Sequence, residues 1–198
     1  MQPLTKESTT FDTADFKQNY FEIFQFEVDF QVDPDALSER YRELQLSVHP
    51  DKFANATEHE KRLSMQWATQ INSAYNTLRV PLSRAIYLLE LNGIKIESNP
   101  ILDPVFLLEQ IELREELEDI ESKGEAALAL LDDYKQRIGQ TMSALLTRFG
   151  TQFVGSDAAQ SEGAGKKESP AEHTVYEMQF VNKLLIAADH LEEKLLGY

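Results

Sequence analysis

An apolar stripe of helical spacing runs along residues 34–48. Asp33 followed by Pro34 is typical of a helix start, because the carboxylate caps the first turn and proline suits the first helical position. Pro50 ends the helix, because the residue before a proline, here His49, is pushed out of the α region. The members of the stripe are Leu37, Tyr41, Leu44 and Val48.

Two more helices follow in the first half of the chain. One starts near Thr57, where the letters TEHE have the capping-box pattern, and Pro81 breaks it. The letters LSRAIYLLELNG predict a shorter helix, which the pair Asn92-Gly93 closes. Upstream, the aromatic-rich segment Asn19–Phe26 is expected to form a short helical turn that packs on this group.

The second half of the chain repeats the same kind of start. Asp103 and Pro104 predict a helix to about Lys123, where Gly124 interrupts. A second helix is expected from about residue 125 to 149, ending at Gly150. A third is expected over residues 171–196.

The pattern shows no strand alternation and no internal repeat, so it predicts an all-α fold. The predicted order begins with a flexible tail over residues 1–17 and a small helical domain over 18–93. A linker over 94–103 leads to a three-helix bundle over 104–198. Within that bundle the Gly/Ala/Ser-rich stretch 155–170 is expected to be a flexible loop.

Composition narrows the classes of function. The chain has 198 residues and no cysteine, which excludes disulfides, thiolate zinc sites and cysteine nucleophiles. The first residues resemble neither a secretion signal nor a mitochondrial presequence, and no apolar run is long enough to span a bilayer. These features predict a soluble cytoplasmic protein with no membrane partner.

Charge is strongly negative but uneven. The formal net charge is −15, so we expect no nucleic-acid partner, because phosphate binding needs a basic surface. Residues 36–95 nevertheless carry a local net charge of +2, whereas residues 97–198 carry −11. The two halves therefore present different fields, which suggests two different partners.

The tripeptide His49-Pro50-Asp51 lies between the first two long helices. An acid–base pair is one interpretation, with His59 as a further candidate, but no nucleophile or phosphate-binding loop is near. A metal site is another interpretation. However, the remaining histidines lie in the second half of the chain, and the spacing of residues near the tripeptide does not indicate three or four metal ligands. The third interpretation is a helix-ending turn that faces water.

The setting of the tripeptide resembles a J-domain. In that family, His-Pro-Asp lies in the loop between two amphipathic helices and stimulates ATP hydrolysis by a DnaK-class chaperone. The resemblance implies a chaperone-binding site that consists of His49, Pro50, Asp51, Lys52, Arg40 and Arg42. One departure is that Leu46, Ser47 and Val48 precede the tripeptide, where J-domains often carry a basic residue and an aromatic residue.

The helix VFLLEQIELREELEDI (105–120) has apolar residues on two faces. At 100° per residue one face carries Phe106, Leu113, Leu117 and Ile120, and this face is the expected core. The second patch consists of Leu107, Leu108 and Ile111 among charged residues. It either packs against another part of the chain or is a docking surface for a protein, since an apolar centre ringed by charge is typical of recognition patches. Phe180, at the edge of the last stripe, is left open between core and anchor.

A narrower resemblance covers residues 18–198 apart from 155–170. The segments FLLEQIELREELEDI and LEEKLLGY resemble the C-terminal domain of the HscB family, J-type co-chaperones of iron–sulfur cluster assembly. LSERYRELQLSVHPDKFA and INSAYNTLRVPLSRAIYLLELNG match the same family in order and spacing.

The resemblance implies a non-enzymatic adaptor. It would bind the scaffold protein IscU and deliver it to the DnaK-class chaperone HscA. It implies no cofactor, no bound metal and no small-molecule substrate. The scaffold-facing residues would be Leu107, Leu108, Ile111, Glu112, Glu115 and Phe180.

Three rival interpretations stay open. They are a general J-domain co-chaperone for unfolded clients, an enzyme that uses His49 and Asp51, and a purely structural helical scaffold.

Overall fold

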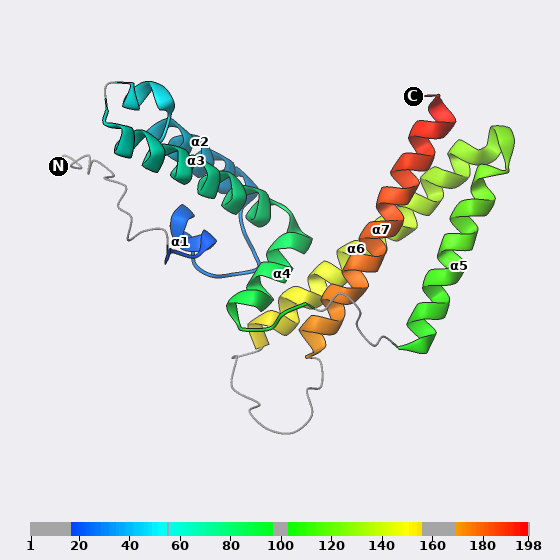
Figure 1. The fold of residues 1–198 in the computed structure, drawn as a ribbon. Helices are drawn as coiled ribbons and strands as arrows, with labels where there is room; N and C mark the ends of the chain where they lie inside the picture. The colour runs from blue at the N-terminus through cyan, green and yellow to red at the C-terminus, as the bar shows by residue number, and fades with distance from the viewer. Residues whose placement is uncertain (1–16, 55, 97–102, 156–168, 198) are drawn as a thin grey trace, which may run out of the picture. The chain divides into compact units, whose positions relative to one another are not determined.

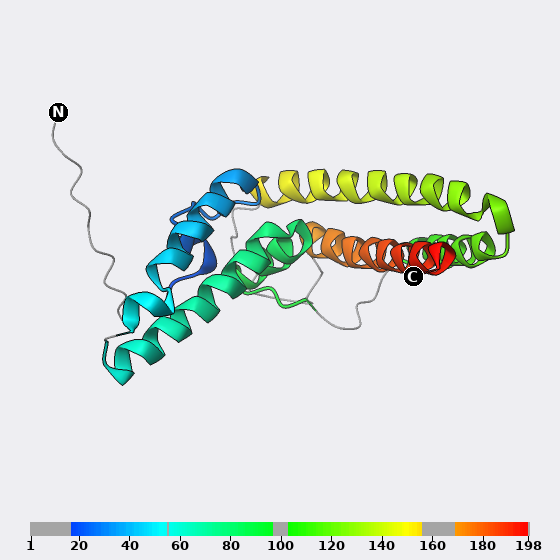
Figure 2. The same ribbon diagram turned by 90° about the horizontal axis from the view of Figure 1, so that it is seen from above.

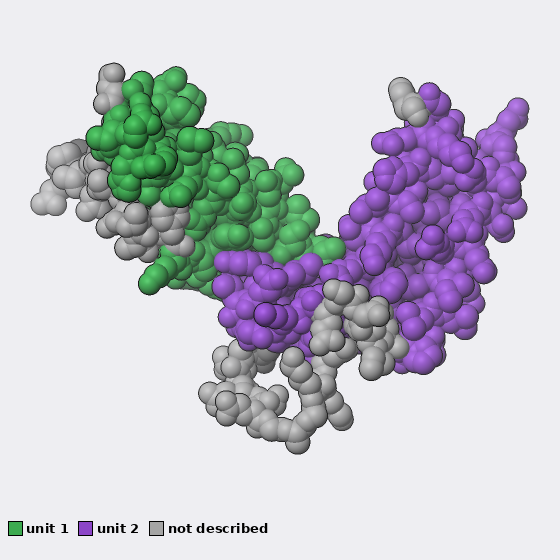
Figure 3. All heavy atoms as spheres, in the orientation of Figure 1, with its two compact units in different colours: residues 1–84 green, residues 85–198 purple. Residues whose placement is uncertain are grey.

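The computed structural model describes residues 17–54, 56–96, 103–155 and 169–197, which form α-helices joined by short turns (Figure 1). No strand occurs in these residues, which confirms the all-α prediction. The chain divides into two compact units, residues 1–84 and 85–198 (Figure 3). The division falls inside α4 (Pro81–Leu91), so the predicted domain boundary at residue 93 stays a prediction.

The first unit contains α1 (Tyr20–Phe24), α2 (Pro34–Ser47) and α3 (Glu58–Arg79). The predicted start of α2 is confirmed, since the Asp33 side chain accepts hydrogen bonds from two backbone N–H groups of the first turn. The capping box of α3 is confirmed as well. The Thr57 hydroxyl accepts from the Glu60 backbone N–H, and the Glu60 carboxylate accepts from the Thr57 N–H.

Both α1 and α2 pack on α3, and their apolar stripes meet in one core. Each buried residue lies at the helical spacing of its own stripe. The rings of Tyr41 and Tyr75 stack at 4.0 Å between centroids and join α2 to α3 beside this core. The buried residues include Phe21, Phe24, Leu37, Leu44, Trp67, Ile71 and Leu78.

The second unit contains α5 (Pro104–Glu121), α6 (Ala127–Gly155) and α7 (Pro170–Leu196). Figures 1 and 2 show α6 and α7 side by side along most of their length, and α5 packs against both. The three helices therefore form the predicted bundle. Lys135 on α6 links the long pair, because its ammonium group contacts Asp189 at 2.6 Å and Glu192 at 2.8 Å on α7.

The predicted end of the middle helix is wrong. Helix α6 continues through Gly150 to Gly155. Phe149 is fully buried and its ring stacks on Phe153 at 5.8 Å, so the apolar stripe extends one turn past the glycine. A single glycine in a helix costs only about 1 kcal/mol, which these contacts offset.

Two other boundaries differ slightly from the prediction. Helix α5 ends at Glu121, and a short 3-10 turn over Gly124–Ala126 leads into α6. Helix α7 begins at Pro170, because Ser169 and Glu172 form a capping box.

The predicted tail and the predicted loop fall almost wholly outside the described residues, as does most of the predicted linker. Among the helices described, none is both long and apolar enough to cross a membrane.

Candidate functional site

Hydrogen bonds hold the backbone at the start of the loop between α2 and α3. The Val48 N–H donates to the Leu44 carbonyl at 3.2 Å, and the Val48 carbonyl accepts from the buried Ser64 hydroxyl at 2.7 Å. The chain then turns into one 3-10 turn over Pro50–Phe53. Because Val48 is buried and held by both helices, the direction in which the next residues leave α2 is set by the core.

His49 and Asp51 lie together at this turn with their side chains in solvent. The Asp51 N–H donates to His49 Nδ1 at 3.3 Å, and the Asp51 carboxylate lies 3.5 Å from the same nitrogen. The side chains are 53% and 92% exposed, so both remain accessible to another protein. The tripeptide therefore forms a stiff turn that presents the Asp51 carboxylate and the His49 imidazole to solvent side by side.

Two of the alternative interpretations, an acid–base pair and a metal site, depend on further side chains near this turn. His59 lies exposed in the first turn of α3 and forms no hydrogen bond with His49 or Asp51. Within the described residues, no group of three or more His, Cys, Asp or Glu side chains is placed to hold a metal ion.

The three cations predicted to lie near this turn differ in their exposure and in their ion pairs. Arg42 and Lys52 are exposed, and neither forms an ion pair with a described carboxylate. Arg40 is half-buried and its Nη1 contacts Glu43 at 2.7 Å, so part of its charge is already neutralised. Arg42 and Lys52 are therefore the cations most available to an acidic partner.

Leu46 and Met65 are the most exposed large apolar side chains among the described residues of this unit. Leu46, one turn before His49, is 64% exposed, because it points away from the face that buries Leu44 and Val48. Met65 on α3 is 67% exposed and was not anticipated from the sequence.

The two faces of α5 are separated as the helical pattern predicted. Leu117 and Ile120 are buried at 6% and 4% exposure, whereas Leu107, Leu108 and Ile111 are 39%, 57% and 55% exposed. Behind α5, the Tyr134 hydroxyl of α6 donates to the Leu113 carbonyl at 3.0 Å. Burial raises the pKa of Tyr134 to about 12, so the phenol keeps its proton and this bond to a higher pH than an exposed tyrosine would.

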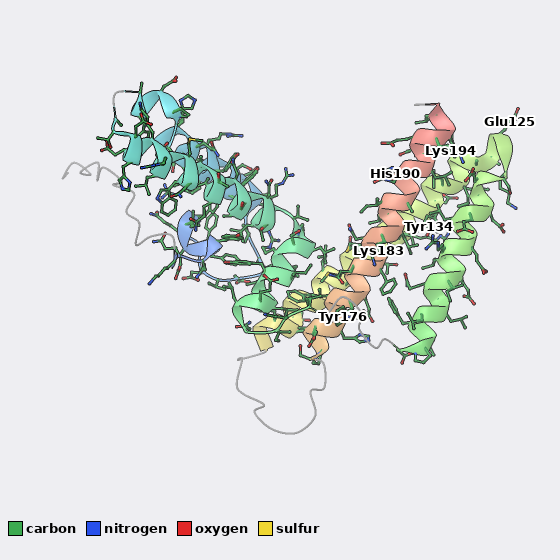
Figure 4. The ribbon with its side chains drawn as sticks, viewed as in Figure 1. Glu125, Tyr134, Tyr176, Lys183, His190 and Lys194 are labelled. Carbon is green, nitrogen blue, oxygen red and sulfur yellow. The ribbon has the colours of Figure 1, made fainter. Side chains whose placement is uncertain are left out.

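Phe180 lies where α7 meets α5. Its ring packs edge-on against Phe106 with centroids 5.6 Å apart, and the Lys183 ammonium lies 5.2 Å from its centroid. The side chain is half-buried, so it serves both the packing of α7 on α5 and the surface between them. Figure 4 labels Lys183 on α7.

A groove of about 680 Å³ lies between α5 and α7. It brings Leu107, Ile111 and Phe180 together, although Phe180 is about seventy residues from the other two in sequence. Leu108, Glu112 and Glu115 do not line it. They are exposed on the neighbouring stripe of α5, so the predicted set contributes to both walls of the groove and to the helix face next to it.

Sequence reasoning missed the rest of the groove. Leu117, Leu184 and Leu191 line it from the edge of the core, with 6% to 8% exposure. Gln110 and Lys183 line it as polar residues. No signal in the sequence marks these residues, because a groove between two helices depends on how the helices pack.

Comparison with known proteins agrees with this arrangement. Residues 102–189 match the family model described as the HSCB C-terminal oligomerisation domain. A co-chaperone protein HscB homolog from Shewanella loihica is 40% identical over 182 residues, which cover 89% of this chain and 99% of the relative.

Two solved structures are also similar. The chaperone HscB from Vibrio cholerae has a TM-score of 0.76 at 35% identity, over 90% of this chain and 99% of that one. The human co-chaperone protein HscB has a TM-score of 0.79 at 26% identity, over 100% and 96% of the two chains.

Proposed function

Because this chain belongs to the HscB family of co-chaperones, we propose that it delivers the scaffold protein IscU to the DnaK-class chaperone HscA and stimulates ATP hydrolysis by that chaperone. It would thereby aid the maturation of iron–sulfur proteins without catalysing a reaction of its own. The observation that carries the proposal is that the two candidate contact surfaces lie in different units, and both are exposed.

The chaperone end is the turn at His49, Pro50 and Asp51. Because this turn is stiff before the partner arrives, little ordering entropy is lost on docking. If the turn binds the fast-hydrolysing state of the chaperone better than the slow one, its binding shifts the chaperone toward the fast state. Arg42 and Lys52 supply charge for an acidic partner surface, and Arg40 contributes less because Glu43 neutralises part of it.

The scaffold end is the outward face of α5 together with Phe180. Leu107, Leu108 and Ile111 form its apolar centre, and Glu112 and Glu115 form an acidic border. Desolvated apolar side chains at the middle of a patch supply most of the affinity, whereas border charges set orientation and the association rate.

The two ends are joined in one chain, so binding of the scaffold at one end raises its effective concentration near a chaperone bound at the other. No direct contact between scaffold and turn is needed for this coupling. The proposal therefore predicts that the two surfaces can be disabled one at a time.

The experiment compares two variants in two assays. His49→Gln is expected to abolish stimulation of the HscA ATPase and to leave scaffold binding unchanged. The triple Leu107→Ala/Leu108→Ala/Ile111→Ala is expected to lose scaffold binding and to keep stimulation by the protein alone. Equal damage by both variants to both activities, in folded protein, contradicts the two-surface proposal.

Matched controls come from the same units. His59→Gln changes another exposed histidine close to the turn. Leu128→Ala/Leu130→Ala removes two exposed leucines of α6, 43% and 40% exposed, that do not line the groove. Both controls are expected to behave as the wild type in both assays.

A further inference from the structure

Ser64 of α3 is bonded to the backbone of α2 at the start of the His-Pro-Asp turn. Its hydroxyl donates to the Val48 carbonyl at 2.7 Å, and the two residues are 16 apart in sequence. The bond therefore crosses from one helix of the first unit to the other, which pack side by side (Figure 1). Both residues are buried, so water is a poor substitute for either partner if the bond is lost.

The Val48 carbonyl needs a donor from outside its own helix. The last carbonyls of an α-helix have no intrahelical partner. In a continued helix this carbonyl would accept from the Lys52 N–H, but that group donates to the His49 carbonyl instead, at 2.9 Å. Pro50 has no N–H to offer. The Ser64 hydroxyl therefore supplies a donor at the point where the chain leaves α2.

This bond acts on the direction of the turn rather than on its internal shape. The Val48 carbonyl and the His49 N–H belong to one planar peptide unit, so holding the carbonyl fixes the plane from which His49 leaves α2. The bonds inside the turn run from the Lys52 N–H to the His49 carbonyl and from the Asp51 N–H to His49 Nδ1. They set the shape of the turn, whereas Ser64 sets its direction relative to α3.

We propose that Ser64 is a positioning residue for chaperone docking, which holds the exposed His49 and Asp51 side chains in the orientation that the chaperone binds. The inference rests on the proposed function and adds to it a buried residue that does not itself reach the partner. Without the bond the turn samples other directions, and only the fraction in the docking orientation binds. The apparent affinity falls by that fraction, whereas the complex, once formed, is the same.

The test is the rate of ATP hydrolysis by HscA, measured against the concentration of this protein in the absence of IscU. Ser64→Ala is expected to raise the concentration needed for half-maximal stimulation about three- to tenfold and to leave the maximal rate unchanged. His49→Gln is expected to lower the maximal rate itself, because it removes a contact group. The inference is overturned if folded Ser64→Ala keeps the wild-type half-maximal concentration.

A second variant separates the hydrogen bond from the volume of the side chain. Ser64→Cys fills the space of the hydroxyl with a thiol, which is only a weak donor. It is expected to raise the half-maximal concentration as Ser64→Ala does. A wild-type value for Ser64→Cys, beside a raised value for Ser64→Ala, would assign the effect to lost volume and overturn the role of the bond.

Two controls separate orientation from stability and from the loss of any hydroxyl. Ile71→Val trims a fully buried side chain of the same helix, and it is expected to lower the melting temperature about as much as Ser64→Ala does. Ser47→Ala removes a hydroxyl that donates to the Leu44 carbonyl at 2.6 Å within α2 itself. Both are expected to keep the wild-type half-maximal concentration. Equal increases in Ile71→Val and Ser64→Ala would make the effect one of stability and overturn the inference.

Failure of this inference and failure of the proposed function give different results. If the wild type stimulates HscA, His49→Gln does not, and Ser64→Ala follows the wild-type curve, the inference is wrong and the proposed function stands. If the wild type does not stimulate HscA at all, both are wrong.

Discussion

Ile111→Ala is the single change that most clearly separates a docking residue from a core residue. Ile111 is 55% exposed and lines the groove, so a little over half of its side chain is available to a partner. Burying a whole isoleucine side chain is worth about 1.5–3 kcal/mol, so docking of this residue contributes about 0.8–1.6 kcal/mol. That range corresponds to a loss of about 4- to 15-fold in affinity for IscU.

The folding cost of the same change comes from the part of Ile111 that is already buried. It is expected to be about 0.5–1 kcal/mol, because alanine recovers a few tenths in helix propensity. Leu131→Ala on α6 is the matched core variant, since Leu131 is 1% exposed and does not line the groove. It is expected to cost about 2–5 kcal/mol of unfolding free energy and to leave the affinity of the folded protein unchanged.

The assays are urea unfolding of each free variant and calorimetric titration with IscU at a temperature where both are folded. We expect Leu131→Ala to have the lower unfolding free energy and Ile111→Ala to have the weaker affinity for IscU. A role of Ile111 in docking is refuted if Ile111→Ala lowers stability as much as Leu131→Ala does and leaves the affinity unchanged.

Three further predictions concern other parts of the chain. Thr57→Ala removes the cap of α3 and is expected to cost about 1 kcal/mol in urea unfolding. Separately, hydrogen bonds from Thr57 lower the pKa of Glu60, so the stabilisation that its carboxylate adds is present above the ordinary carboxyl pKa and is lost as the pH falls through the lowered pKa. Tyr134→Phe is expected to cost about 1 kcal/mol at pH 7, because the Leu113 carbonyl loses its donor. Burial raises the pKa of Tyr134 from 10.0 to about 12, so unfolding releases its proton in that window and the wild type loses about 1.4 kcal/mol per pH unit. Unfolding measured at pH 7 and pH 11 is expected to show a smaller alkaline loss in the Phe variant than in the wild type. Leu46→Lys adds a cation at an exposed position one turn before the His-Pro-Asp turn, and it is expected to raise chaperone stimulation at low salt by up to about fivefold, with no gain at high salt.

Helix starts were predictable from the sequence because they depend on local chemistry. Asp33 with Pro34 and Asp103 with Pro104 mark the first turns of α2 and α5 within a few residues, and the structure confirms both caps. The capping box at Thr57 was predictable for the same reason. Such signals need no knowledge of the rest of the fold.

Helix ends and surfaces were harder to predict because they depend on tertiary contacts. Gly150 has the local character of a stop, but Phe149 and Phe153 continue the packing past it, and α6 runs on. The sequence also predicted that Leu107 and Ile111 point away from the core. The helical pattern alone left Phe180 of α7 open between core and surface, and only the resemblance to the HscB family grouped it with these two residues; the structure places all three at one groove.

The burial of a single atom is even harder to predict from the sequence. In the sequence Gln110 looks like any surface position of a helix, and the burial of its Oε1 depends on tertiary packing that the sequence does not show. The exposure of His49 and Asp51 was likewise open until the turn was seen to face solvent, although the motif itself was plain.

The adaptor account is tested most directly by the rate of ATP hydrolysis by HscA with this protein alone, with IscU alone, and with both. The account predicts that the wild type alone raises the rate, that both together raise it beyond the sum of the separate effects, and that His49→Gln removes both gains. Simple addition of the two effects, or undiminished stimulation by His49→Gln, contradicts it.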